Sequence, residues 1–166
     1  MIFDKGGGIL ILKVRKHGDP VLRMRALPVK EITKEMLTLA GNMLETMYAV
    51  DGVGLAANQV GIPVQLVVID IGEGPMTLFN PRIVKHNGEE TSGREGCLSV
   101  PGLTGEVTRW DKIVVEKLAE NGSASERLEA EGLLARALQH EIDHLDGILF
   151  IDKATDIMEE QAENEV

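Results

Sequence analysis

The sequence predicts one domain of the α+β class, and two observations support this. The segments with strand-like hydrophobicity lie together in the middle of the chain, while two long helix-like segments stand apart from them. The regular strand–helix alternation of a doubly wound parallel sheet is missing. The length of 166 residues suits a single catalytic domain, 1–166, with its own hydrophobic core.

A short helix and a long helix are expected before the first strand. Pro20 follows a Gly-Asp turn and suits the first position of the short helix. Thr33 can cap a helix over residues 34–50, where Met and Leu side chains recur at helical spacing. The glycines that follow at positions 52 and 54 end this helix. Residues 1–8 are interpreted as an N-terminal extension.

The strands are expected in the second part of the chain. Residues 64–71 form a continuous apolar run, which is typical of a buried strand. An Asn-Gly turn at positions 121–122 predicts that the strands on either side of it form a hairpin. The expected strands are 64–71, 76–80, 83–85, 112–118, 127–130 and 148–151. The second long helix is expected over 132–146, and an acidic helix or tail over 156–166.

Charge and composition exclude several classes of function. A net charge of −10 argues against nucleic acid as a direct partner, because phosphate binding needs a basic surface. No segment approaches the roughly 20 apolar residues of a membrane span. No signal or transit peptide is recognisable, so the cytoplasm is the expected compartment. The single cysteine, Cys97, excludes an intrachain disulfide and fits a reducing environment.

The strongest chemical signal is a His-Glu-Ile-Asp-His segment at positions 140–144. On a helix, His140 and His144 lie on one face, so that both rings can reach the same metal ion. Glu141 is offset by about 100° and is placed to act on water rather than to bind the metal. The surrounding helix is apolar on most sides, which predicts burial. A surface helix with an exposed histidine pair is the alternative.

A third ligand is needed for a catalytic site with an open coordination position. Cys97, which is expected on a separate loop, is the best candidate, because glycines flank it and let the backbone approach a site closely. His17 and His86 lie in polar, turn-like contexts and are expected at the surface. A separate segment, residues 52–61, is dense in small residues and contains Gln59, a neutral hydrogen-bond donor. Its Gly-Val-Gly is weak evidence for a phosphate loop.

Together, these segments resemble the peptide deformylase family. The family pattern is G-x-G-x-A-A-x-Q, then E-G-C-L-S, then Q-H-E-x-D-H-L-x-G. In this chain the three motifs stand at residues 52–59, 95–99 and 139–147, in the same order. The resemblance extends over about residues 11–151. Arg94 departs from the acidic or polar residue that family members often carry, but it adjoins no expected ligand.

The resemblance implies a metal-dependent hydrolase that removes the N-formyl group from the initiator methionine of new polypeptides and releases formate. It also implies antiparallel sheets around a central, buried metal-binding helix. One divalent metal ion per chain is expected, with Fe²⁺ as the native ion and Zn²⁺, Ni²⁺ or Co²⁺ as replacements. A Cys-His-His ligand set is compatible with both iron and zinc, and zinc generally binds more tightly.

Catalytic roles follow from the residues and the resemblance together. Glu141 is expected to act as general base and then general acid. The Gln59 amide and the Leu98 backbone N–H are candidate donors to the oxyanion. Glu95 is expected to orient a ligand. The resemblance suggests that Asp143 pairs with Arg109; ordinary surface carboxylates are the alternative for both acidic residues.

The substrate is expected to bind through its backbone, because new chains share only their first residue. An extended peptide can add to a sheet edge near Val53 and Gly54. Val53, Leu133 and Ala137 are expected to line the methionine pocket, although plain core packing would also explain them. Arg136 is expected at its rim.

Two other functions remain open at this stage. A zinc endopeptidase can share the His-Glu-x-x-His motif, but such enzymes more often take a histidine or carboxylate as third ligand. A metal or redox sensor using Cys97 would close the fourth coordination position. The sequence leaves the oligomeric state open, with a monomer favoured, and leaves open a transient ribosome contact.

Overall fold

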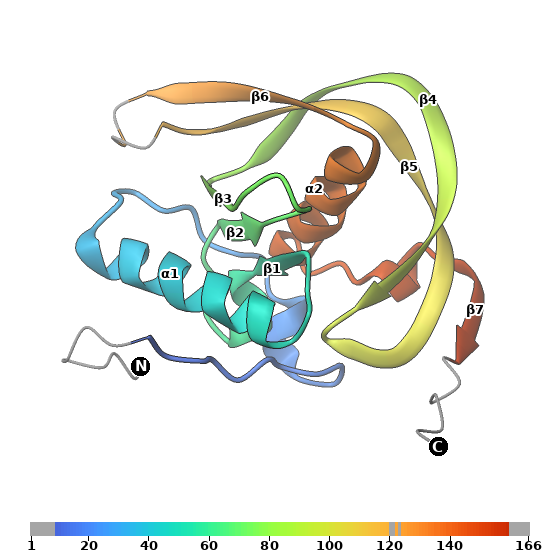
Figure 1. The fold of residues 1–166 in the computed structure, drawn as a ribbon, viewed down its shortest axis with the longest axis horizontal. Helices are drawn as coiled ribbons and strands as arrows, with labels where there is room; N and C mark the ends of the chain where they lie inside the picture. Colours follow the sequence, from blue (N-terminus) through green and yellow to red (C-terminus); the bar gives the residue numbers. More distant parts are fainter. Residues whose placement is uncertain (1–8, 120–121, 123, 160–166) are drawn as a thin grey trace.

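Two antiparallel sheets surround a central helix in the computed structural model, which describes residues 9–119, 122 and 124–159 (Figure 1). The elements, in chain order, are the 3₁₀ helix η1 (Pro20–Arg23), α1 (Lys34–Ala49), β1 (Gly54–Ala56), the 3₁₀ helix η2 (Ala57–Val60), β2 (Leu66–Ile69), β3 (Met76–Phe79), β4 (Arg82–Cys97), β5 (Val100–Leu118), β6 (Ser125–Glu131), α2 (Gly132–Leu145), the 3₁₀ helix η3 (Phe150–Asp152) and β7 (Thr155–Glu159). The expected α+β class, with antiparallel sheets around a buried helix, is confirmed.

The smaller sheet, in the order β1-β2-β3, separates the two long helices. Alternate residues of β2 pack in two different hydrophobic clusters. Val68 packs in the cluster that contains Met43 and Met47 of α1. Val67 packs in the cluster that contains Leu138 of α2. Because both faces are covered, all four residues of β2 are buried, which explains the continuous apolar run in the sequence.

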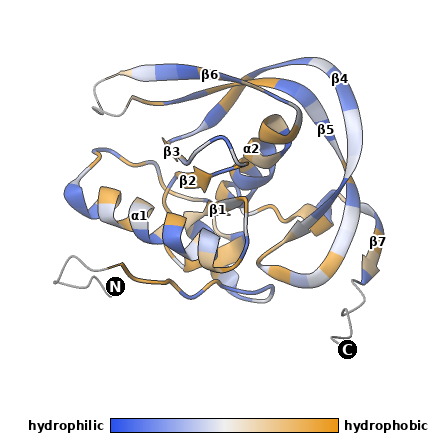
Figure 2. Ribbon diagram, in the orientation of Figure 1, coloured by the Kyte–Doolittle hydropathy of each residue, from blue (hydrophilic) through white to orange (hydrophobic). Residues whose placement is uncertain are grey.

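The larger sheet is dominated by a long hairpin of β4 and β5, which curves around α2 (Figure 1). The strands are 16 and 19 residues long and pair from Arg82↔Glu116 to Cys97↔Val100. Three register shifts interrupt the ladder, and such irregularities bend a strand. The sequence predicted only short parts of this hairpin, because β4 is largely exposed and hydrophilic (Figure 2) and lacks clean alternation.

Two other strands extend this sheet along different parts of β5. β6 pairs with residues 112–118, which confirms the hairpin expected around the Asn-Gly turn. β7 pairs with residues 103–106, near the opposite end of β5. The acidic helix expected over 156–166 is therefore wrong for residues 156–159, which add to the open edge of β5. Residues 160–166 lie outside the described part of the chain, as does the expected extension 1–8.

The strand expected over 148–151 is also wrong. This segment passes into η3, where the side chain of Asp152 accepts a hydrogen bond from the Leu149 N–H at 2.8 Å. Asp152 also pairs with Arg23 of η1. The Asp152 carboxylate thus satisfies a backbone N–H that would otherwise need a partner strand. This local hydrogen bond competes with strand formation.

Helix α2 begins and ends close to the positions expected from the sequence. Gly132, its first residue, and Gly147, two residues after its last, both have positive φ, at 58° and 75°. A Cβ at Gly147 would lie 2.6 Å from the Arg23 carbonyl oxygen, so only glycine fits there. No helix among the described residues is long and apolar enough to cross a membrane.

We expect Leu138→Ala to lower the free energy of unfolding by about 2–5 kcal/mol, because it removes a fully buried side chain from the centre of α2. Leu138 is 0% exposed, whereas Leu133 on the same helix is 57% exposed. Leu133→Ala should change stability by no more than about 0.5 kcal/mol. Urea unfolding measures both variants, and equal losses would contradict this account of the core.

Candidate metal centre

The structure brings Cys97, His140 and His144 together into a group that can hold a metal ion. Their ligand atoms all lie within 4.8 Å of one another. The histidines come from one face of α2, and their ring centroids are 5.0 Å apart. Cys97 was expected on a loop, but it is the last residue of β4, directly before the two-residue turn to β5. All three ligands therefore sit on regular elements or at their ends.

Distances and charge in this group fit a metal ion. Cys97 Sγ lies 3.3 Å from His144 Nε2. Sulfur and nitrogen ligands of a tetrahedral zinc ion would be about 3.5 Å apart. Burial alone would lower the pKa of His140, but hydrogen bonds to Cys97 and Glu95 outweigh it and raise the pKa to about 10. The site thus favours a positive charge beside the thiol, which a metal cation can supply.

His144 and Glu141 are both deeply buried beside this group. Burial lowers the pKa of His144, so that its ring is neutral and suited to bind a metal. Burial raises the pKa of Glu141 to about 7. Glu141 Oε2 has no hydrogen-bond partner among the described residues. A buried carboxylate oxygen without a partner is costly, which indicates that another polar group, such as water, belongs beside it.

Gly54 in β1 is needed because the Glu141 carboxylate lies against it. A Cβ at this position would be 2.5 Å from Glu141 Oε1. The sequence linked Gly54 to substrate binding at a sheet edge, and the structure adds this close approach to α2. The Gly-x-Gly segment therefore gives the carboxylate room beside β1.

The side-chain amide of Gln59 is held by hydrogen bonds at both its oxygen and its nitrogen. Its Oε1 accepts a hydrogen bond from the Ala56 N–H at 2.8 Å. Its Nε2 donates to Ser99 Oγ at 3.1 Å and lies 3.6 Å from Cys97 Sγ. Ser99 was not predicted as a site residue, although its place in the Cys97 motif was a usable signal.

A buried ion-pair network lies behind the metal group. Arg109 Nε and Nη2 each donate to Glu95 at 2.9 Å, and Arg109 Nη1 donates to Asp143. Glu95 Oε2 accepts from His140 Nδ1 at 2.9 Å. Burial would raise the pKa of Glu95, but the bonds from Arg109 and His140 lower it to about 2. The contacts expected for Glu95, Arg109 and Asp143 are thus present in the structure.

A cavity of about 600 Å³ opens in front of the metal group. Most of the expected site residues line it. The metal-group residue His144 and the network residues Arg109 and Asp143 lie outside its wall. The expected residues in the wall are Val53, Gly54, Gln59, Glu95, Cys97, Leu98, Leu133, Arg136, Ala137, His140 and Glu141. Val53 and Leu133 are half exposed or more, whereas Ala137 is buried. The hollow has the size of an ordinary ligand site.

Lys16 is a cavity residue that sequence reasoning missed. Its Nζ donates to the Leu98 carbonyl oxygen at 2.6 Å. The neighbouring backbone N–H groups of Arg15 and His17 donate to the carbonyl oxygens of Gln59 and Ser99, both at 2.7 Å. Because most of these contacts are made by backbone, the side-chain sequence carried no signal for them.

The remaining histidines lie apart from the metal group, as expected. His17 is exposed. His86 on β4 stacks on Trp110 of β5, with ring centroids 4.4 Å apart. Neither belongs to the group of metal-binding side chains found among the described residues.

Comparison with known proteins gives one consistent result. A family model described as polypeptide deformylase matches residues 11–160. The peptide deformylase of Halothermothrix orenii is 55% identical over 152 residues, covering 90% of this chain and 97% of the relative. The peptide deformylase of Thermoanaerobacter pseudethanolicus is 55% identical over 153 residues, covering 92% and 95%.

Solved structures agree with the sequence relatives. The crystal structure of peptide deformylase from Thermotoga maritima has a TM-score of 0.84 and 42% identity, covering 88% of this chain and 99% of that one. A peptide deformylase from Synechococcus elongatus in complex with actinonin has a TM-score of 0.83 and 46% identity, covering 87% and 79%. The fold and the motifs therefore point to the same family.

We expect Arg109→Met to lower the free energy of unfolding by about 3–5 kcal/mol, because it leaves the buried Glu95 carboxylate without its main partner. The Arg109 side chain is 3% exposed. Arg127 on β6 is 71% exposed and lies 3.8 Å from Glu116, so Arg127→Met is the matched control. The control should lose no more than about 1 kcal/mol in chemical denaturation. A small loss in Arg109→Met would mean that the network contributes little.

Proposed function

The chain belongs to the polypeptide deformylase family, and we propose that Cys97, His140 and His144 hold the metal ion with which it works. Enzymes of this family are metal-dependent hydrolases that remove the N-formyl group from the N-terminal methionine of newly made polypeptides. The water oxygen adds to the formyl carbon, the C–N bond breaks, and formate and a free amine leave. The approach of the three ligand atoms is the observation that carries the proposal.

The metal supplies Lewis acidity to water and to the formyl oxygen when it is bound. Three protein ligands leave a coordination position open, as catalytic sites require. The ligands sit on α2 and at the end of β4, and Glu95 holds the outer nitrogen of His140. This arrangement leaves His140 Nε2 free to face the ion, and it fixes the ring orientation.

Glu141 is proposed as the proton carrier. Its unpartnered Oε2 accepts the proton that water loses on attack, and it then gives this proton to the leaving nitrogen. A pKa raised to about 7 by burial suits both steps near neutral pH. Gly54 leaves the space that the carboxylate needs beside the cavity.

Gln59 and Leu98 are proposed as donors to the oxygen that becomes negative during attack. Gln59 Nε2 lies beside Cys97 Sγ, and Ser99 holds the amide in place. Leu98 lies in the two-residue turn after Cys97, outside the β4–β5 ladder, so its N–H is not committed to strand pairing. Preorganised donors of this kind stabilise the transition state more than the substrate.

The substrate is proposed to lie along β1, with its backbone near Val53 and Gly54. The methionine side chain would enter the cavity between Val53, Leu133 and Ala137. Because the Synechococcus elongatus relative was solved in complex with actinonin, we expect this compound to occupy the same cavity here. An endopeptidase or a sensor is not favoured, since the relatives are named deformylases.

Ferrous iron is proposed as the native ion, with Zn²⁺, Ni²⁺ or Co²⁺ as replacements. The thiolate-imidazole ligand set is compatible with each of them, so iron is not selected by affinity alone. We further propose that the chain acts as a monomeric catalytic domain in the cytoplasm. A transient contact with the ribosome would bring it to its substrates.

We expect Glu141→Gln to lose formate release from formyl-Met-Ala-Ser by about 100- to 10,000-fold, because proton transfer is removed. Metal content should stay at the parent value, since Glu141 is not proposed as a ligand. Glu129→Gln on β6, which does not line the cavity, serves as the control and should keep full activity. Parent-like activity in Glu141→Gln would rule out its role.

Metal removal should abolish formate release, because the described residues that line the cavity offer no Lewis acid of their own. Under anaerobic conditions, we expect added Fe²⁺ to restore more activity than added Zn²⁺. The measurement is the initial rate of formate release at matched metal occupancy. Equal or higher activity with Zn²⁺ would argue against iron as the native ion.

A further inference from the structure

The Glu95 carboxylate is saturated by donors from one strand, β5, and from helix α2. Oε1 accepts from Arg109 Nε at 2.9 Å and from Arg136 Nη1 at 2.8 Å. Oε2 accepts from Arg109 Nη2 and His140 Nδ1, both at 2.9 Å. Each oxygen offers about two lone-pair sites, so all of them are used. Removing Arg136 would empty one site and allow the carboxylate to turn away from His140.

Arg136 is itself held by the backbone of the long hairpin. Its Nη1 also donates to the Val107 carbonyl oxygen at 2.8 Å, and its Nη2 donates to the Thr91 carbonyl oxygen at 2.8 Å. Gly93 leaves room for the guanidinium, since a Cβ there would lie 3.0 Å from Arg136 Cζ. Arg136 therefore joins α2 to both β4 and β5 at the level of Glu95.

We infer that Arg136 is a positioning residue for the metal ligand His140 and acts on it through Glu95. Arg136 and His140 lie one turn apart on α2, and both reach the same carboxylate on β4. The guanidinium fixes Glu95, and Glu95 fixes the ring of His140 through Nδ1. This inference rests on the proposed ligand set, and it differs from a role for Arg136 in contacting substrate at the cavity rim.

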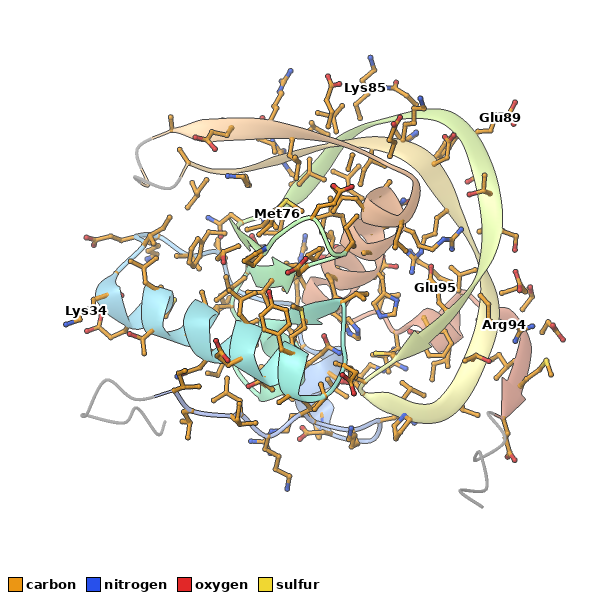
Figure 3. The ribbon with its side chains drawn as sticks, viewed as in Figure 1. Lys34, Met76, Lys85, Glu89, Arg94 and Glu95 are labelled. Atoms are coloured by element: carbon orange, nitrogen blue, oxygen red, sulfur yellow. The ribbon has the colours of Figure 1, made fainter. Side chains whose placement is uncertain are left out.

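Arg94 provides a matched control for this inference. Both arginines line the cavity. Arg94 pairs with Asp156 of β7 and with Glu106, and its side chain is 38% exposed, against 17% for Arg136. Figure 3 shows Arg94 on the side of the hairpin near β7 and Glu95 nearer α2. Arg94 forms no hydrogen bond or ion pair with the Glu95 carboxylate in the described part of the chain, so it shares charge and location with Arg136 but not the link to His140.

The test is a Co²⁺ titration of the metal-free, full-length chain, followed by the thiolate-to-cobalt absorption band. Arg136→Met should raise the Co²⁺ dissociation constant by about tenfold or more, as expected for a residue that supports a ligand. Arg136→Lys should give an intermediate value, because one ammonium group cannot reach Glu95 and both strand carbonyls. Arg94→Met should stay within about twofold of the parent, since no ligand depends on it.

Thermal unfolding of each metal-free variant separates positioning from stability, because the titration is run far below the unfolding temperature. A lower unfolding temperature with an unchanged dissociation constant would overturn the inference. If Arg136→Met raises KM for formyl-Met-Ala-Ser but leaves Co²⁺ binding unchanged, the inference is also overturned. Arg136 would then be a residue that contacts the substrate. If the parent binds Co²⁺ without a thiolate band, the ligand set itself fails, and the inference fails with it.

Discussion

The buried ion pair between Glu95 and Arg109 is the interaction on which the rest of the site depends. It joins the end of β4 to the middle of β5, and through His140 and Asp143 it reaches two successive turns of α2. Burying two charges is costly unless their hydrogen bonds are satisfied, and here the pairing is bidentate with further partners on both sides. The helix that carries the histidines therefore has one orientation in which these groups are satisfied.

The long hairpin and the central helix make this pairing possible. A flat hairpin would meet α2 at one place, but β4 and β5 curve around it (Figure 1). Side chains of α2 therefore reach β5 at Val107 and β4 from Thr91 to Cys97. The same curvature brings Cys97 at the end of β4 to His144, near the end of α2. The small sheet closes the other side, where Gly54 of β1 lies against Glu141. The site thus forms between three elements, each held by its own core contacts.

The sequence predicted the chemistry of the site better than its scaffold. The pair His140 and His144 follows from helical periodicity, which is local and needs no knowledge of the fold. The length of β4 could not be predicted, because its exposed residues give no alternating pattern and its curvature depends on contacts with α2. The positions of Lys16 and β7 were missed because backbone hydrogen bonds of the residues on either side of Lys16 and an open strand edge, rather than side-chain pattern, place them.

Glu141 shows how stability and chemistry are balanced in this helix. Its unpartnered oxygen is unfavourable for folding, and its raised pKa is the direct consequence of that burial. On the neighbouring strand β4, Glu95 is also buried, but its saturated hydrogen bonds lower its pKa. The pKa values of these two buried carboxylates therefore shift in opposite directions because their hydrogen-bond partners differ. The saturated one holds the helix against the hairpin, so the unsatisfied one can remain available for the proton transfer proposed for it.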